Sequence, residues 1–197
     1  SVNALRDYYS GNAAFWEFQA LLKARPVAGD IKTGECFVDM ARDILIRHGS
    51  LVFASDIRAM RERIQKELAK EIATSWDIKL GLGGIEELEF TVQYLQLKNC
   101  NKFPSLLVQG TLDAVQRMKR AEILKEPDAD FMGNAYIFYR TLESYLRLRE
   151  RDILKKDEED ILNAVSEFLG LKNKDELIGK LDETRAKVRN LYNLLVI

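Results

Sequence analysis

The sequence is poor in the residues that usually build metal sites, disulfides and rigid turns. Its 197 residues include only two cysteines, three prolines and one histidine. Cys36 and Cys100 have no CxxC spacing, which favours reduced thiols over a disulfide framework or a zinc site. The one histidine, His48, lies before Gly49 at a predicted helix end, where a basic side chain is favourable. The usual Ser-His-Asp and His-metal schemes are therefore excluded, and we expect no metal site of that kind.

Long apolar runs and an excess of charge are also missing. No stretch approaches the ~18 uninterrupted apolar residues of a membrane-spanning helix, and no signal peptide is recognisable. With 30 basic and 31 acidic residues, the net charge of −1 gives no general attraction to nucleic acid or anionic membranes. We therefore expect a cytoplasmic protein that binds neither.

Helical patterns account for most of the chain. Apolar residues make up 47% and charged residues 31%, a balance typical of a folded globular protein. Strand patterns are limited to two candidates, residues 51–53 and 78–80. The fold class is therefore all-α, most simply an antiparallel helical bundle. Apolar periodicity, capping residues and prolines predict helices over residues 13–24, 33–48, 56–74, 85–98, 112–124, 127–154, 157–169 and 174–196. Asn173 and Glu176 have capping-box spacing at the start of the last of these helices.

The most informative segment is residues 77–90, DIKLGLGGIEELEF, with three glycines in four positions before a helix. Glycine amides at a helix N-terminus can bind a phosphate group. The same glycines can equally form a tight connection between helices, because glycine adopts backbone conformations that other residues resist. A dinucleotide fingerprint and a P-loop are excluded, since the final glycine spacing and the Lys-Ser/Thr pair are missing.

The helix after the glycines has apolar residues on two sides, with a polar strip between them that contains Glu86 and Glu89. A helix of this kind is buried on two sides. Glu89 lies close enough to one apolar stripe to be partly buried and to need a partner. Lys79, Arg25 or the Arg61/Arg63 pair could supply that partner, so a structural ion pair and a ligand or metal contact both stay open.

Two other carboxylate patterns are more simply explained by helix capping. Asp128 and Asp130 follow a proline at a predicted helix start, where acidic residues are common. Gly49-Ser50 followed by Asp56 hints at a nucleotidyltransferase metal motif, but position 58 is arginine and Asp56 reads as a helix cap.

Several long motifs, in order along nearly the whole chain, resemble the bacterial glutamine synthetase adenylyltransferase family. Among them, Trp-Glu-Phe-Gln at residues 16–19 and Met-Arg-Glu-Arg at residues 60–63 resemble the C-terminal, adenylylating half of such enzymes. Phe18, Leu82 and Glu86 depart from positions that are often basic in the family. The motifs that carry the resemblance lie at residues 16–30, 60–64, 77–90, 93–97, 104, 111–112, 135–143, 188–189 and 194–195.

The resemblance implies an enzyme that transfers AMP from ATP to a tyrosine of glutamine synthetase, or removes it, in nitrogen regulation. ATP and Mg²⁺ would be its cofactors, with the metal held by strand-borne Asp-x-Asp carboxylates. No such set occurs here, so those carboxylates would lie before Ser1. Residues 1–30 would be the remnant of the catalytic domain and residues 31–197 the helical domain. We expect the isolated fragment to be inactive, to contain no catalytic residue and to bind no cofactor tightly.

In this interpretation the helical domain packs against the missing catalytic domain of the same chain and borders the active-site cleft. The expected partners are glutamine synthetase and a PII-type nitrogen-signalling protein. Lys23 and Arg25 would contact phosphate or an acidic partner, or else form surface ion pairs. The residues expected to border the cleft are Lys79, Gly83, Gly84, Glu87, Glu89, Lys23 and Arg25.

A second class of function remains open from the sequence. The chain could be a docking or regulatory helical module that binds glutamine synthetase or a PII-type protein without nucleotide contact. Uridylyltransferase of a PII-type protein shares the broader architecture, but residues 79–90 fit it less well.

Overall fold

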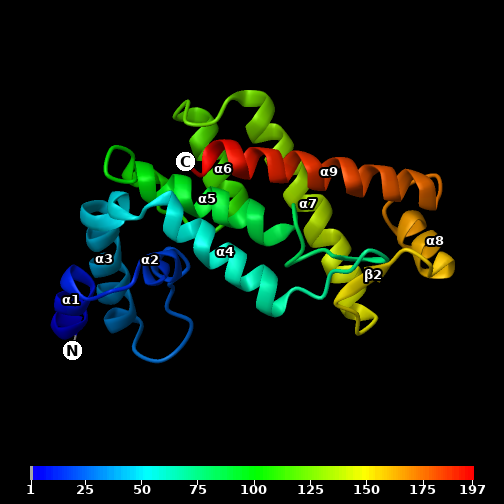
Figure 1. Cartoon of the computed structure of the whole chain (residues 1–197). Helices are drawn as coiled ribbons and strands as arrows, with labels where there is room; N and C mark the ends of the chain where they lie inside the picture. The colour runs from blue at the N-terminus through cyan, green and yellow to red at the C-terminus, as the bar shows by residue number, and fades with distance from the viewer. Residues whose placement is uncertain (1) are drawn as a thin grey trace. The chain divides into compact units, whose positions relative to one another are not determined.

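The computed structural model describes residues 2–197 and is mostly helical, as predicted (Figure 1). Within these residues it contains nine α-helices, two short 3₁₀ turns and one pair of short strands. The elements in chain order are α1 Val2–Gly11, α2 Phe15–Leu22, α3 Ile31–His48, η1 Gly49–Leu51, α4 Ala54–Leu68, β1 Ser75–Asp77, α5 Ile85–Asn99, η2 Pro104–Leu106, α6 Thr111–Arg120, α7 Glu126–Leu148, β2 Ile153–Lys155, α8 Glu159–Phe168 and α9 Lys174–Leu195.

Helix ends follow the capping residues of the sequence. Asp30 accepts hydrogen bonds from the amides of Lys32 and Thr33 and so starts α3. Asn173 accepts from the amide of Glu176 and starts α9, as its predicted capping spacing requires. Both apolar stripes predicted for residues 85–98 are buried, which confirms that α5 is covered on two sides.

Four predictions about local structure are wrong, two of helix ends and two of strands. The helix predicted to run to residue 74 ends at Leu68, and the helix predicted to run to residue 154 ends at Leu148. The predicted strands at residues 51–53 and 78–80 are not strands; β1 and β2 form instead. They pair antiparallel, with Trp76 opposite Leu154. Because this pairing joins segments far apart in sequence, neither strand carries a local signal.

The early end of α7 has a backbone cause. Glu150 has a left-handed φ of 57°, and the amide of Arg151 donates to the carbonyl of Leu146, which closes the helix. Glycine usually takes the left-handed position of such a turn. Because a glutamate takes it here, the sequence gives no signal that the helix ends.

The described residues divide into two compact units, and helices α4, α5 and α7 each contribute residues to both. The first unit contains residues 2–60 and Val92–Ala129, with Val196. Its core lies around α2, α3 and the second half of α5: the Gln19 amide donates to Gln93 at 2.9 Å, and the Cys100 thiol donates to the carbonyl of Leu45. Burial raises the pKa of the Cys100 thiol to about 11, and both cysteines are free.

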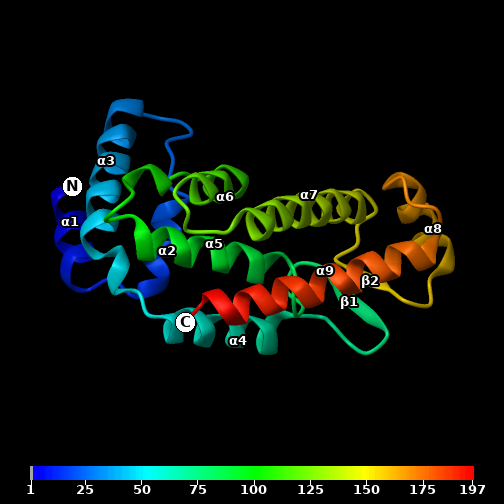
Figure 2. The same ribbon diagram turned by 90° about the horizontal axis from the view of Figure 1, so that it is seen from above.

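The second unit contains Arg61–Thr91 and Asp130–Leu195, with Ile197. It holds the strand pair, the glycine turn and helices α7, α8 and α9. Figure 2 shows α7 leading toward α8 and α9 leading back from it. The Trp76 indole donates to Asp182 of α9 at 3.0 Å, which ties β1 to that helix. None of the helices in residues 2–197 is long and apolar enough to cross a membrane.

Candidate functional site

The backbone amides of the glycine turn are occupied by protein acceptors. The amide of Leu82 donates to Glu71 at 3.0 Å, and the amide of Gly83 donates to Glu87 at 2.9 Å. These two carboxylates occupy the positions in which a phosphate group would have to bind. The turn is therefore a tight connection whose negative partners come from the chain itself.

Local backbone bonds use the remaining amides of the turn. Gly81 donates to the carbonyl of Asp77 at 2.9 Å, and Gly84 donates to the carbonyl of Gly81 at 3.1 Å. The amide of Ile85 then donates to the carbonyl of Ile78, so the turn leads directly into α5. A Cβ on Gly84 would lie 2.6 Å from that same Ile78 carbonyl oxygen, so the packing of the turn requires a glycine here.

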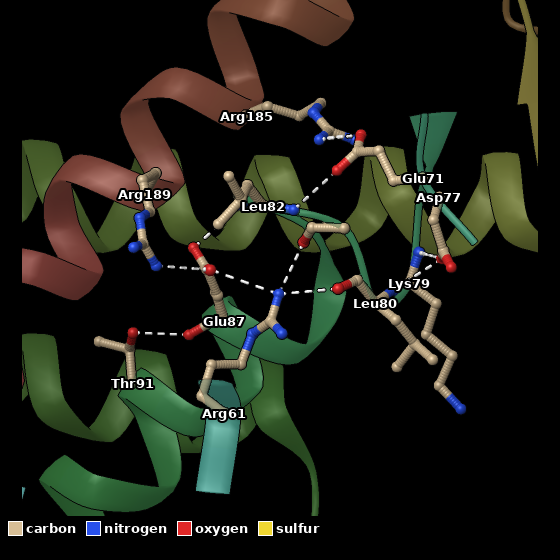
Figure 3. Close-up of polar contacts among 12 residues, drawn as sticks. Arg61, Glu71, Asp77, Lys79, Leu80, Leu82, Glu87, Thr91, Arg185 and Arg189 are labelled. Carbon is tan, nitrogen blue, oxygen red and sulfur yellow. Dashed lines mark hydrogen bonds and ion pairs between the residues drawn. The ribbon is translucent and has the colours of Figure 1, made fainter. Parts of the chain in front are cut away.

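Glu87 and Arg61 form a fully buried ion pair beneath the turn (Figure 3). Their side chains are 0% and 1% exposed, and the Arg61 Nη2 lies 3.3 Å from the Glu87 Oε1. The same Nη2 donates to the carbonyls of Leu80 and Gly81 at 2.8 Å each. Burial lowers the pKa of Arg61, and the charge of Glu87 opposes that change. Arg61 therefore connects α4 to both the turn and α5.

Helix α9 supplies two further arginines to this cluster. Arg189 donates to Glu87 at 2.7 Å, and Arg185 forms an ion pair with Glu71. The hydroxyl of Tyr139 on α7 donates to the carbonyl of Gly83 at 2.6 Å, and burial raises the pKa of that tyrosine. The turn is consequently fixed by α4, α7 and α9 together.

A second carboxylate organises the segment just before the glycines. Asp77 is buried and accepts hydrogen bonds from the amides of Lys70, Lys79 and Leu80, at 2.9, 3.1 and 2.8 Å. The backbone of Lys79 is thus held by Asp77 on one side. On the other side, its carbonyl accepts from the amide of Glu86 at 3.1 Å.

The Lys79 side chain, in contrast, is not held by a direct polar contact among the described side chains. It extends away from the Glu87 carboxylate (Figure 3) and lines a pocket of about 230 Å³. Lys70, Arg147 and Arg151 also line this pocket, each with an acidic partner. Within residues 4–197, the Lys79 ammonium group makes no hydrogen bond or ion pair. A rigidly held backbone therefore presents the Lys79 ammonium group at the pocket, where its charge also acts on Glu86.

Glu86 and Glu89 lie on the adjacent turn of α5. Burial raises the pKa of Glu86, and the nearby Glu89 carboxylate raises it further, while Lys79 opposes the change. Glu89 is half-buried and accepts from the Tyr136 hydroxyl at 2.9 Å. Of the partners that the sequence offered for Glu89, which were Lys79, Arg25 and the Arg61/Arg63 pair, Arg61 binds Glu87 instead.

The predicted site residues fall into both units. Lys79, Gly83, Gly84, Glu87 and Glu89 belong to the second unit, where the first four surround or continue the glycine turn. Lys23 and Arg25 belong to the first unit.

Lys23 donates to the carbonyl of Gln109 at 2.8 Å and so connects α2 to the segment before α6, whereas Arg25 is exposed. In residues 4–197, no group of three or more histidine, cysteine, aspartate or glutamate side chains is placed to hold a metal ion.

Four residues of the cluster were missed by reasoning from sequence: Glu71, Tyr139, Arg185 and Arg189. Tyr139, Arg185 and Arg189 lie far along the chain from their partners. Glu71 lies in the segment that was wrongly predicted to continue α4. The only local signal is the spacing of Arg185 and Arg189, which places both arginines on one face of a helix.

The fold and the site thus define a class of structure: a helical domain in which buried ion pairs fix a glycine turn. The chain belongs to the family described as GlnD PII-uridylyltransferase, whose model matches residues 52–196. The same domain is shared with bifunctional glutamine synthetase adenylyltransferase/adenylyl-removing enzymes, as the resemblance in the sequence predicted at this level.

Three such enzymes show the extent of the similarity. The enzyme of Cutibacterium acnes is 36% identical over 181 residues, which cover 90% of this chain and 18% of that enzyme. The enzyme of Bifidobacterium longum subsp. infantis is 33% identical over 215 residues, covering 97% of this chain and 20% of the enzyme. The enzyme of Streptomyces avermitilis is 38% identical over 170 residues, which cover 84% of this chain and 17% of that enzyme. The chain spans about a fifth of the length of the curated relatives it matches.

Proposed function

We propose that this chain is the helical domain of a bifunctional glutamine synthetase adenylyltransferase/adenylyl-removing enzyme, in its adenylylating half. The observation that carries the proposal is the 36% identity to such an enzyme over 90% of the chain. In this proposal residues 1–30 complete a preceding catalytic domain and residues 31–197 form the helical domain. The enzyme transfers AMP from ATP to a tyrosine of glutamine synthetase and responds to a PII-type signalling protein.

The chemistry belongs to the catalytic domain in this proposal. ATP and Mg²⁺ would be held there by strand-borne Asp-x-Asp carboxylates, as the resemblance implies. The helical domain contributes a surface at the cleft, formed by Lys79 and Glu89. The buried residues Gly83, Gly84 and Glu87 position this surface, and Lys23 and Arg25 contact an acidic or phosphorylated partner.

We expect the purified 197-residue chain to be inactive. Incubated with glutamine synthetase, ATP and Mg²⁺, it should incorporate no more AMP than a blank without the chain, measured with radiolabelled ATP. The full-length enzyme that contains this domain serves as the positive control. Adenylylation by the chain alone would contradict this division of the chemistry.

In the full-length enzyme, Lys79→Ala should lower the adenylylation rate by about tenfold with little change in the melting temperature. A tenfold loss corresponds to one charged contact removed from the reacting complex. Glu89→Gln should also lower the adenylylation rate, because it removes a charge from the same surface. The melting temperature should change little, because a glutamine can still accept the hydrogen bond from Tyr136. Rate and melting temperature are measured on the same preparations.

The matched control is Lys66→Ala, which removes an exposed lysine of α4 in the same unit and should leave both quantities unchanged. If Lys79→Ala and Glu89→Gln lower stability in proportion to activity, their role is structural. If they leave adenylylation intact but weaken binding of glutamine synthetase, the domain is a docking module without nucleotide contact.

A further inference from the structure

Asp77 is a buried carboxylate that the proposed function leaves without a role. It is 4% exposed and ends strand β1, directly before the segment that carries Lys79. Its Oδ1 accepts from the amide of Lys79 at 3.1 Å (Figure 3) and from that of Leu80 at 2.8 Å. Its Oδ2 accepts from the amide of Lys70 at 2.9 Å. Hydrogen bonds to an ionised group are about twice as strong as neutral ones, so Asp77 holds these three amides firmly.

The same bonds leave Asp77 little capacity to bind a substrate or a metal ion. A carboxylate offers about four acceptor positions, and backbone amides occupy three of those of Asp77. Among the residues that the structure describes, Asp77 also joins no group of acidic, histidine or cysteine side chains that could hold a metal. Any effect of Asp77 on a reaction therefore passes through the residues that it holds.

Two of the residues that Asp77 holds, Lys70 and Lys79, line the pocket of about 230 Å³. The Lys70 ammonium group is already bound to Asp152 at 2.6 Å. The Lys79 ammonium group has no such contact, and the Lys79 backbone is fixed from both sides, by Asp77 at its amide and by the amide of Glu86 at its carbonyl. Lys79 is thus the lysine whose side chain can contact another molecule from a fixed starting point.

We propose that Asp77 is a positioning residue for adenylylation, because it fixes the backbone from which Lys79 reaches the reacting complex. The inference rests on the proposed function, in which Lys79 supplies a contact to that complex. A displacement of about 1 Å in a group that contacts the substrate can lower a rate by up to about 100-fold. Because Asp77 acts through Lys79, its loss should cost no more than the loss of Lys79 itself, about tenfold.

The test is a double-mutant cycle in the full-length enzyme, with Asp77→Ala, Lys79→Ala and both substitutions together. Asp77→Ala removes the acceptor of all three amides and should lower the adenylylation rate by about three- to tenfold. In the Lys79→Ala background the same substitution should lower the rate by less than about twofold, because no ammonium group is left to position. Asp77→Asn keeps an oxygen for the amides of Lys79 and Leu80 and should retain at least about half of the parent's rate.

A matched control separates positioning from stability. Asp77→Ala should also lower the melting temperature, since three amides lose their acceptor, so rates are compared where circular dichroism shows each variant fully folded. Asp182→Ala releases the Trp76 indole of the same strand but leaves the bonds of Asp77 intact, and it should keep the parent's rate. If Asp77→Ala does not fold, Asp77→Ser takes its place in the cycle, because a serine hydroxyl accepts more weakly from the amide two residues on.

A second measurement does not depend on activity. Amide hydrogen exchange, followed by NMR in the 197-residue chain, reports how firmly each amide is held. In Asp77→Ala the amides of Lys79 and Leu80 should exchange at least about tenfold faster relative to the amide of Gly83, which Glu87 holds. In Asp77→Asn they should stay protected.

The outcomes separate this inference from the proposed function. Equal losses on Asp77→Ala with and without Lys79, or unchanged exchange at Lys79 and Leu80, would overturn the inference and leave the proposed function standing. A Lys79→Ala enzyme with the parent's rate would overturn the proposed function, and the role of Asp77 in the reaction with it.

Discussion

Glu87→Gln is expected to lower the free energy of unfolding by about 3–5 kcal/mol, the usual cost of leaving one member of a buried ion pair without its partner. The substitution preserves shape but removes the charge and one of the two acceptor oxygens, which together accept from Gly83 and Arg189 and face Arg61. Arg61 is 1% exposed and would stay buried with its charge uncompensated, while the half-exposed Arg189 can return to water. Urea unfolding followed by far-ultraviolet circular dichroism measures the loss.

The matched control is Lys70→Ala, which breaks an ion pair in the same unit. Lys70 and Asp152 are 63% and 71% exposed, so this variant should unfold close to the parent's midpoint. Adding Arg61→Met to Glu87→Gln should recover part of the lost stability, because no buried charge is then stranded. A Glu87→Gln midpoint equal to the parent's would show that the pair contributes nothing.

Gly83→Ala is expected to destabilise the protein by about 2–5 kcal/mol for two separate reasons. Gly83 has a φ of +68°, which an L side chain resists. A Cβ there would also lie 2.1 Å from the carbonyl oxygen of Arg185, so α9 or the turn would have to move. The same urea titration measures the change.

Two other glycines separate these causes. Gly170 also has a φ of +68°, but a Cβ on it meets open space, so Gly170→Ala carries the backbone cost alone. Gly179 lies within α9 with nothing near its Cβ position, and Gly179→Ala should stabilise the helix by about 0.5–1 kcal/mol. If Gly83→Ala costs no more than Gly170→Ala, the close approach of α9 does not constrain the turn.

Local signals were sufficient for much of the helical fold. The spacing of apolar residues in α5 predicted burial on both sides, and Asn173 placed the start of α9. The same reasoning failed where a helix ends without glycine, as at Glu150, and where a strand depends on a distant partner, as for Trp76 and Leu154.

The glycine turn shows the same division. Its sequence predicted a sharp connection that presents Lys79, and it left open whether the amides bind a phosphate or close a turn. Only the tertiary structure decided, because the acceptors of those amides, Glu71 and Glu87, are held in place by Arg185 and Arg189 of α9.

The sequence by itself therefore determined the helical class, most helix positions and the family. These depend on short-range periodicity and on sequence motifs shared with relatives. The tertiary structure decided which charges are buried together and which side chains stay free. Arg61 and Lys79 are both basic residues near the same turn. Only packing against α5 and α9 places the first beside Glu87 and leaves the second at an open pocket.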